Sequence, residues 1–263
     1  MAGLFTDSQT QPDTDATLTP VEVRAGVYVK RDDLFTYVGV NGGKARTCAV
    51  LARGARGLVT SGSRTSPQCN IVAHIGQHLG IPVHIHTPTG ELSPELLDAQ
   101  STGAKVYQHK SGYNSVIQER ARVDALAEGW TEIPFGMSCL EHVRQTRGQV
   151  RNVPLDTKRI VMAVGSGMSL AGVLWGLEDA GLGAVPVLGV MVGASPIKHL
   201  NEFAPNHWHN VVQLITSGTD YGKESAITNL DGIRLDLHYE AKAVAFLLPG
   251  DLFWVVGIRR TAE

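Results

Sequence analysis

The stretch Asn41-Gly42-Gly43-Lys44-Ala45-Arg46 precedes apolar positions at Cys48, Leu51 and Ala52, a spacing that predicts a helix beginning at about Lys44. Two glycines let the chain turn tightly and bring the lysine close to a neighbouring group. The helix dipole disfavours a cation at a helix start, which pushes a lysine towards its neutral, nucleophilic form. A Gly-Gly-Lys triplet alone is more often a surface loop, so the role of Lys44 depends on the rest of the chain.

Strand-like and helix-like runs alternate on the C-terminal side of this stretch. The predicted strands lie at 57–60, 81–86, 105–107, 131–134, 159–164, 185–192 and 252–256, after one or two short strands at 21–29. The predicted helices lie at 44–53, 69–79, 94–100, 113–128, 142–150 and 239–248, with a further helix that ends at 177 and a mixed region at 196–222. This alternation indicates an α/β fold with parallel sheets and right-handed crossovers.

Composition narrows the class of protein. The apolar fraction of 43% and the charged fraction of 18% are those of an ordinary globular chain. The net charge of −2, without a basic stripe, disfavours nucleic-acid binding as the main task. Three cysteines with neither disulfide nor zinc spacing indicate a reducing compartment. Without a signal peptide or a membrane-spanning run, we expect a cytoplasmic protein whose polar residues 1–17 are mobile.

A glycine- and serine-rich turn follows the apolar run 159–164. Its sequence is Gly165-Ser166-Gly167-Met168-Ser169-Leu170-Ala171-Gly172, and a helix is predicted directly after it. Backbone N–H groups at such a strand-to-helix turn bind anions, phosphate above all. The turn is neither a Walker A motif nor a dinucleotide fingerprint, and the alternative is a tight turn with nothing bound.

A lysine nucleophile and a phosphate-binding turn together suggest pyridoxal phosphate, whose aldehyde bonds to a lysine. The chain resembles the tryptophan synthase β-like (fold type II) superfamily of pyridoxal-phosphate enzymes, and within it the branch of aminocyclopropane-carboxylate deaminase and D-cysteine desulfhydrase. Three segments carry the resemblance: 30–34 with 41–46, 165–172, and the late Asp-Leu-His-Tyr-Glu-Ala-Lys at 236–242.

The resemblance implies a fold and an assembly. We expect two doubly wound α/β domains with largely parallel sheets and the cofactor in the cleft between them. The large domain would comprise residues 1–51 and 144–263, and the small domain would be inserted at 52–143. Members of the superfamily usually form dimers, so a homodimer is expected.

The resemblance also assigns roles to residues. Lys44 would carry the cofactor, and Gly165, Ser166, Gly167, Met168 and Ser169 would hold its phosphate. Tyr239 would be an active-site tyrosine, and Glu240 would face the pyridine nitrogen. An ionised carboxylate there keeps the nitrogen protonated, so that the ring withdraws electrons from the substrate. The alternative for Glu240 is a solvated residue of the helix predicted at 239–248.

The chain departs from the family pattern at several points. Ser66-Pro67 stands where the family has Ser-Asn, which places the reactive serine at Ser66 and leaves Asn70 as the candidate substitute for the asparagine. The late glycine turn is reduced to 256–258, and the segment between 192 and 236 is shorter than usual. Most residues expected to bind the cofactor therefore follow the family pattern, whereas those expected to bind the substrate depart from it.

Side chains of the 61–67 turn are candidates for substrate binding. Arg64, with Ser63 and Thr65, is a candidate clamp for a substrate carboxylate, as is Arg46, because guanidinium binds carboxylates through two hydrogen bonds. The alternative is a solvated surface arginine, which is commoner in proteins than a carboxylate clamp. The histidines at 74, 78, 84 and 86 lack an accompanying carboxylate motif, so no metal site is predicted. Cys69 has no histidine partner in the sequence and is interpreted as a packing residue.

These observations favour a lyase or deaminase that acts on a small, amino-acid-like molecule through an external aldimine, with the freed Lys44 as general base. One alternative is a decarboxylase acting on an amino acid attached to a larger group such as a modified nucleobase, the one case in which nucleic acid would be a partner. A second alternative is a non-catalytic paralogue that binds the cofactor without turnover.

Overall fold

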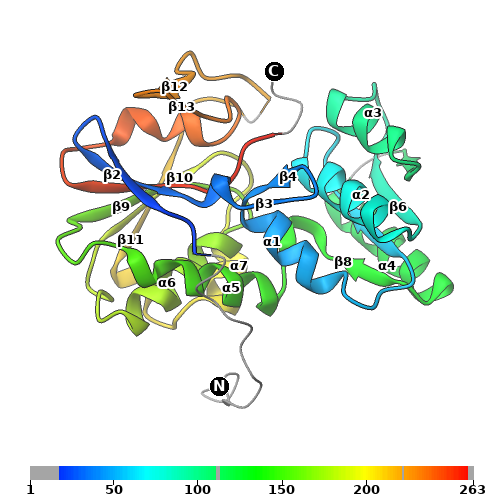
Figure 1. Ribbon diagram of the computed structural model, residues 1–263, viewed down its shortest axis with the longest axis horizontal. Helices are drawn as coiled ribbons and strands as arrows, with labels where there is room; N and C mark the ends of the chain where they lie inside the picture. Colours follow the sequence, from blue (N-terminus) through cyan, green and yellow to red (C-terminus); the bar gives the residue numbers. More distant parts are fainter. Residues whose placement is uncertain (1–17, 111–112, 221, 260–263) are drawn as a thin grey trace.

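The computed structural model describes residues 18–110, 113–220 and 222–259 and contains two large β-sheets (Figure 1). The six-stranded sheet has the order β1-β2-β14-β9-β10-β11. These strands are Val21–Arg24, Val27–Arg31, Asp251–Val255, Arg159–Val164, Val187–Met191 and Val212–Thr216. All neighbours run parallel except β1, which is antiparallel to β2.

The four-stranded sheet has the order β7-β6-β5-β8 and is parallel throughout. Its strands are Lys105–His109, Val83–Pro88, Leu58–Ser61 and Thr131–Ile133. The predicted α/β fold with largely parallel sheets is therefore confirmed. This sheet lies within residues 58–133, and the strands of the other sheet come from both flanks. The domain boundaries at 52 and 143 stay a prediction.

Helices cover both faces of the smaller sheet (Figure 1). They are α1 (Gly42–Leu51), α2 (Pro67–Leu79), α3 (Pro94–Ser101) and α4 (Asn114–Glu128). The first three share a core with Leu58 and Ile85, and α4 packs on the opposite face against Val59. Since Val59 follows Leu58 directly, the period-2 alternation of a strand explains the two-sided burial.

The larger sheet is covered differently on its two faces (Figure 1). On one face lie α5 (Leu140–Arg147), α6 (Met168–Asp179) and α7 (Ile197–Phe203), which share a core with Ile160, Met162 and Trp254. On the other face the hairpin β12 (Asn229–Leu230) and β13 (Ile233–Arg234), with the segment 235–247, buries Val161 and Phe253.

The α-helix predicted at 239–248 is wrong. The chain there forms two short 3₁₀ turns, η5 (Glu240–Lys242) and η6 (Val244–Phe246). Tyr239, at φ −131° and ψ −92°, is outside the helical region, and the Ala241 N–H donates to the Asp236 carbonyl. Tertiary burial of Glu240 and Ala241 therefore overrides a sequence that favours an α-helix.

Other differences from the predicted elements are smaller. The mixed region contains α7 and β11, and the helix predicted over 142–150 ends at Arg147 and continues as η3 (Gly148–Asn152). The remaining elements are η1 (Asp32–Leu34), β3 (Thr36–Tyr37), β4 (Val40–Asn41), η2 (Phe135–Met137) and η4 (Trp208–Asn210). The stretch 1–17, predicted to be mobile, lies outside the described residues. No helix among the described residues combines the length and the apolar character needed to cross a bilayer.

Candidate active site

The turn before Lys44 is docked onto the end of β14. Gly42 has φ +84°, and a Cβ there would lie 2.4 Å from the Val256 carbonyl oxygen, so only glycine fits. The Gly43 N–H donates to the same oxygen over 3.0 Å, and the Ile258 N–H donates to Asn41 Oδ1 over 2.9 Å. The first turn of α1 is thereby fixed to the central strands of the larger sheet.

Lys44 is the third residue of α1, which packs on α2 of the small sheet and on α5 of the large one. The helix therefore lies between the two halves of the molecule (Figure 1). Lys44 Nζ makes no hydrogen bond within the described residues. Burial lowers the pKa of the Lys44 amine, and the nearby Arg259 guanidinium lowers it further. Both effects favour the neutral amine that a nucleophile requires.

A buried ion pair fixes α1 to η1. Arg46 Nη2 contacts Asp32 Oδ1, and both side chains are almost fully buried. The Arg46 guanidinium also lies over the Phe35 ring, with 5.0 Å between its central carbon and the ring centroid, and it donates to the Gln145 carbonyl. Because these partners hold Arg46 in the core, its guanidinium is not available as a carboxylate clamp.

The glycine turn lies between β9 and α6, as its sequence predicts. Gly167 has φ +88°, and a Cβ there would lie 2.8 Å from the Pro196 side chain. Ser166 Oγ donates to the Gly136 carbonyl over 3.0 Å, and His199 Nδ1 donates to the Ser166 carbonyl over 2.8 Å. The Gly165 N–H donates to the Tyr239 hydroxyl over 2.7 Å. Two of the motifs, far apart in sequence, therefore meet at this turn.

Glu240 is the most unusual buried group in the structure. Only 1% of its surface is exposed, and neither carboxylate oxygen is paired with another side chain among the described residues. Burial raises the pKa of the Glu240 carboxyl well above its ordinary value, and repulsion from Asp236 adds to the effect. Buried polar atoms are rarely left without a partner. A protonated pyridine nitrogen is a donor that would satisfy the Glu240 carboxylate, so this residue fits the cofactor that the sequence indicates.

Arg259 and its acidic neighbours form a cluster that sequence reasoning missed. Arg259 Nε lies 3.0 Å from Asp236 Oδ2, and Nη1 lies 3.9 Å from Glu95 Oε1 on α3. All three side chains are buried, and the cluster links α3 to the segment 235–247 of the large half. No sequence signal marks Arg259, since an isolated arginine has no motif around it.

The 61–67 turn makes hydrogen bonds within itself, to the start of α2 and to the segment 86–93. Ser66 caps α2, because its hydroxyl accepts from the Gln68 N–H over 3.3 Å, and Pro67 occupies the first helical position, where proline is favoured. Arg64 Nη1 donates to the Glu91 carbonyl over 2.8 Å. Thr65 is exposed, and Ser63 is half-buried. The predicted substrate roles of Ser63, Arg64, Thr65 and Ser66 stay predictions.

Asn70, the candidate replacement for the family's asparagine, has its amide committed to α3. Its Nδ2 donates to Asp98 Oδ2 over 2.5 Å and to the Glu95 carbonyl over 3.5 Å. Its cofactor role therefore stays a prediction, one that requires the amide to leave Asp98. Cys69, beside it, is fully buried, and burial raises the pKa of its thiol to about 12, in keeping with packing rather than catalysis.

The histidines form polar contacts of their own. His74 Nε2 lies 2.8 Å from Asp98 Oδ2, and His84 Nδ1 and His86 Nε2 both contact Asp124 Oδ2, at 2.7 and 3.0 Å. Within the described residues, no group of three or more His, Cys, Asp or Glu side chains is arranged to hold a metal ion.

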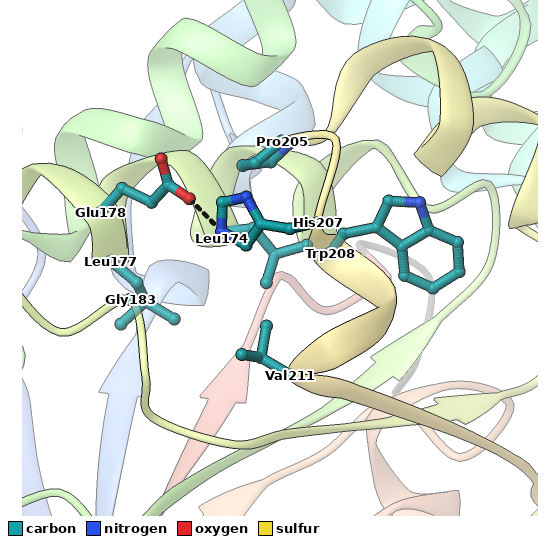
Figure 2. Close-up of a pocket in the computed structure, with 8 residues that line it drawn as sticks. All are labelled: Leu174, Leu177, Glu178, Gly183, Pro205, His207, Trp208 and Val211. Carbon is teal, nitrogen blue, oxygen red and sulfur yellow. Dashed lines mark ion pairs between the residues drawn. The ribbon is translucent and has the colours of Figure 1, made fainter.

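A pocket on the large half involves none of the candidate site residues (Figure 2). It lies between the C-terminal end of α6 and the segment 205–211, and the ion pair of Glu178 Oε1 and His207 Nε2, at 2.6 Å, crosses its wall. The lining residues are Leu174, Leu177, Glu178, Gly183, Pro205, His207, Trp208 and Val211.

Comparison with known proteins supports the cofactor that the site suggests. The model of the family described as "Pyridoxal-phosphate dependent enzyme" matches residues 16–236. No curated protein sequence matches the chain.

Three solved structures show the same fold. A homologue of ACC deaminase has a TM-score of 0.75 and 21% identity, over 94% of this chain and 95% of that one. The processed form of threonine deaminase isoform 2 from Solanum lycopersicum has a TM-score of 0.67 and 15% identity, over 94% and 86%. Diaminopropionate ammonia lyase from Escherichia coli has a TM-score of 0.63 and 13% identity, over 92% and 83%.

Proposed function

Because the chain belongs to the family of pyridoxal-phosphate dependent enzymes, we propose that it is a lyase of the deaminase or desulfhydrase type that acts on a small amino acid. The observation that carries the proposal is Glu240, whose buried carboxyl group is paired with no other side chain among the described residues. This carboxyl also lies close enough to Lys44 to influence the pKa of the lysine. When bound, the cofactor supplies the electron sink that lets a bond at the substrate α-carbon break.

Each element of the site then has a task. Lys44 would hold the cofactor through its side-chain amine, and the free amine would serve as the base for the proton of the substrate α-carbon. The turn 165–169 would bind the phosphate through the N–H groups that follow Gly165, at the N-terminus of α6. Glu240 holds the proton of the pyridine nitrogen. Tyr239 orients the turn through its bond to Gly165.

The substrate is held, in this proposal, by the turn that contains Ser63, Arg64, Thr65 and Ser66. Arg259 is a further candidate for binding an acidic group, because its guanidinium is buried and its charge reaches Lys44. The ion pair with Asp236 would have to rearrange for that contact to form. A homodimer and a cytoplasmic location belong to the proposal as well, and sedimentation of the purified chain tests the dimer.

The first test is the visible absorbance of the purified protein. The wild type should show the band of a cofactor bound covalently to lysine, and Lys44→Ala should lack it. Lys198→Ala removes an exposed lysine of α7 and serves as the matched control, which should keep the band. No band in the wild type, even after addition of pyridoxal phosphate, would overturn the proposal.

Turnover on a panel of amino acids then separates the reactions. Ammonia together with a keto acid supports the deaminase type, and sulfide with them supports the desulfhydrase type. Release of carbon dioxide would favour the decarboxylase alternative, for which a nucleoside carrying an amino acid on its base belongs in the panel. A stable band with no product from any substrate would favour a non-catalytic cofactor-binding protein.

A further inference from the structure

A chain of buried hydrogen bonds connects the Lys44 turn to the glycine turn through His142. This histidine lies on α5 and is 1% exposed. Its Nδ1 lies 2.8 Å from Thr47 Oγ1 on α1, and its Nε2 lies 2.9 Å from Ser169 Oγ at the start of α6. Thr47 Oγ1 also lies 3.0 Å from the carbonyl oxygen of Gly43, the residue before Lys44.

The contacts fix where each proton lies. The Thr47 hydroxyl has one hydrogen, which it donates to the Gly43 carbonyl, so its oxygen accepts from His142 Nδ1–H. A neutral imidazole carries only that one proton, and Nε2 therefore accepts from the Ser169 hydroxyl. Burial keeps this ring neutral by lowering the pKa of His142 to about 3, and the Arg46 guanidinium lowers that pKa further.

We propose that His142 is a positioning residue that holds the anion-binding turn at the start of α6 and the Lys44 turn of α1 in one fixed arrangement. The inference rests on the proposed function, since it assigns the two ends of the chain to the cofactor phosphate and to the cofactor aldehyde. His142 touches neither group in this assignment and acts through Ser169 at one end and through Thr47 at the other.

Substitutions at the two ends of this chain of hydrogen bonds should affect the binding of pyridoxal phosphate and of pyridoxal differently. Pyridoxal has the aldehyde but lacks the phosphate, so it reports on the Lys44 side alone. Ser169→Ala should weaken binding of pyridoxal phosphate about tenfold, the cost of one hydrogen bond that orients a charged ligand's site, and leave pyridoxal binding nearly unchanged. Thr47→Val should weaken both ligands by a similar factor, because it loosens the turn that carries Lys44.

Variants of His142 separate the two contacts on one residue. Asparagine places its amide near the position of Nδ1, and glutamine places its amide near that of Nε2. His142→Asn should therefore show the signature of Ser169→Ala, whereas His142→Gln, which keeps the Ser169 contact and loses the Thr47 contact, should show that of Thr47→Val and weaken both ligands by a similar factor. His142→Phe removes both contacts and should weaken both ligands, pyridoxal phosphate the more. Thr146→Val, one turn later on α5, is the matched control and should change neither affinity.

The measurement is titration of cofactor-free protein with each ligand, followed by the visible band, alongside thermal unfolding without ligand. Equal losses for both ligands in Ser169→Ala and His142→Asn would show that His142 only fills space, and would overturn the inference. If His142→Phe does not fold, Ser169→Ala and Thr47→Val decide the outcome alone. A wild type that binds neither ligand would overturn the proposed function, and the inference with it.

Discussion

Among single residues, Glu240 gives the strongest indication of function. An acid whose pKa is raised in the folded state binds more protons there than in the unfolded chain. Its contribution to the stability of the cofactor-free protein is therefore full below pH 4.5, the ordinary value, and decreases as the pH rises towards the folded pKa. Such a loss of stability in the cofactor-free protein is typical of a functional site, where the buried group pairs with a bound ligand.

The substitution Glu240→Gln tests this account. Glutamine keeps the shape and cannot ionise, so the cofactor-free variant should lose less stability between pH 5 and pH 8 than the wild type. We expect its melting temperature near pH 8 to exceed that of the wild type by about 2–4 °C, the shift for roughly 1 kcal/mol in a protein of this size. Turnover should fall about 100-fold, because the amide cannot hold the pyridine proton. A variant with wild-type turnover would exclude Glu240 as the partner of the ring nitrogen.

The sequence marked some candidate site residues and gave no sign of others, for a physical reason. Lys44, Glu240 and the turn 165–169 stand in short segments on which the family resemblance rests. His142 and Arg259 owe their positions to contacts across more than 20 residues, with Ser169 and with Asp236 respectively. Arg46 is the opposite case. Its sequence context suggested a clamp for a substrate carboxylate, whereas Asp32 and Phe35 hold its guanidinium in the core.

At the scale of elements, the site depends on how α1 begins. The residues directly after β14 and the start of α1 share hydrogen bonds, and the glycine at position 42 is what lets them approach. The pattern of apolar residues predicted both elements but not their contact. The edge strand β11 was missed because its exposed and half-buried residues lack a continuous apolar run.

Gly42→Ala should break this contact. The substitution combines a positive φ with a Cβ 2.4 Å from a carbonyl oxygen, and we expect a loss of about 2–5 kcal/mol of unfolding free energy. It should also abolish the visible band of the bound cofactor, because Lys44 moves with the turn. Gly54→Ala is the matched control: its φ of +70° gives the strain, about 1–2 kcal/mol, with no atom within 4 Å. Equal losses in the two variants would show that the close approach to β14 contributes nothing.

For the whole molecule, the buried ionisable groups determine how stability depends on pH. The β/α alternation was enough to predict the sheets, but the charges that the fold buries could not be read from it. His142 and His109 have lowered pKa values, and so does Lys30, whose pKa burial lowers to about 7. A base with a lowered folded pKa contributes stability that is full above its unfolded pKa and decreases as the pH falls towards the folded pKa. Glu240 has the opposite effect, because its contribution to stability decreases as the pH rises.

His142 should dominate below neutral pH. Between its ordinary pKa of 6.5 and its folded pKa of about 3, the unfolded chain binds one more proton than the folded one at this position. At 1.36 kcal/mol per pKa unit, the full interval amounts to on the order of 5 kcal/mol, a large share of the stability of an ordinary domain. The cofactor-free protein should therefore unfold in mild acid.

Denaturant unfolding at pH 7.5, 6, 5 and 4 measures this slope. Between pH 6 and pH 4 the wild type should lose about 1.4 kcal/mol per pH unit to His142 alone. His142→Phe should remove that part of the slope even if it lowers the stability at pH 7.5, because phenylalanine has no proton to bind. Thr146→Val removes no titrating group and should keep the wild-type slope. If His142→Phe kept it too, His142 would bind protons equally in the folded and unfolded chains, and the neutral ring on which the Thr47–His142–Ser169 connection depends would be excluded.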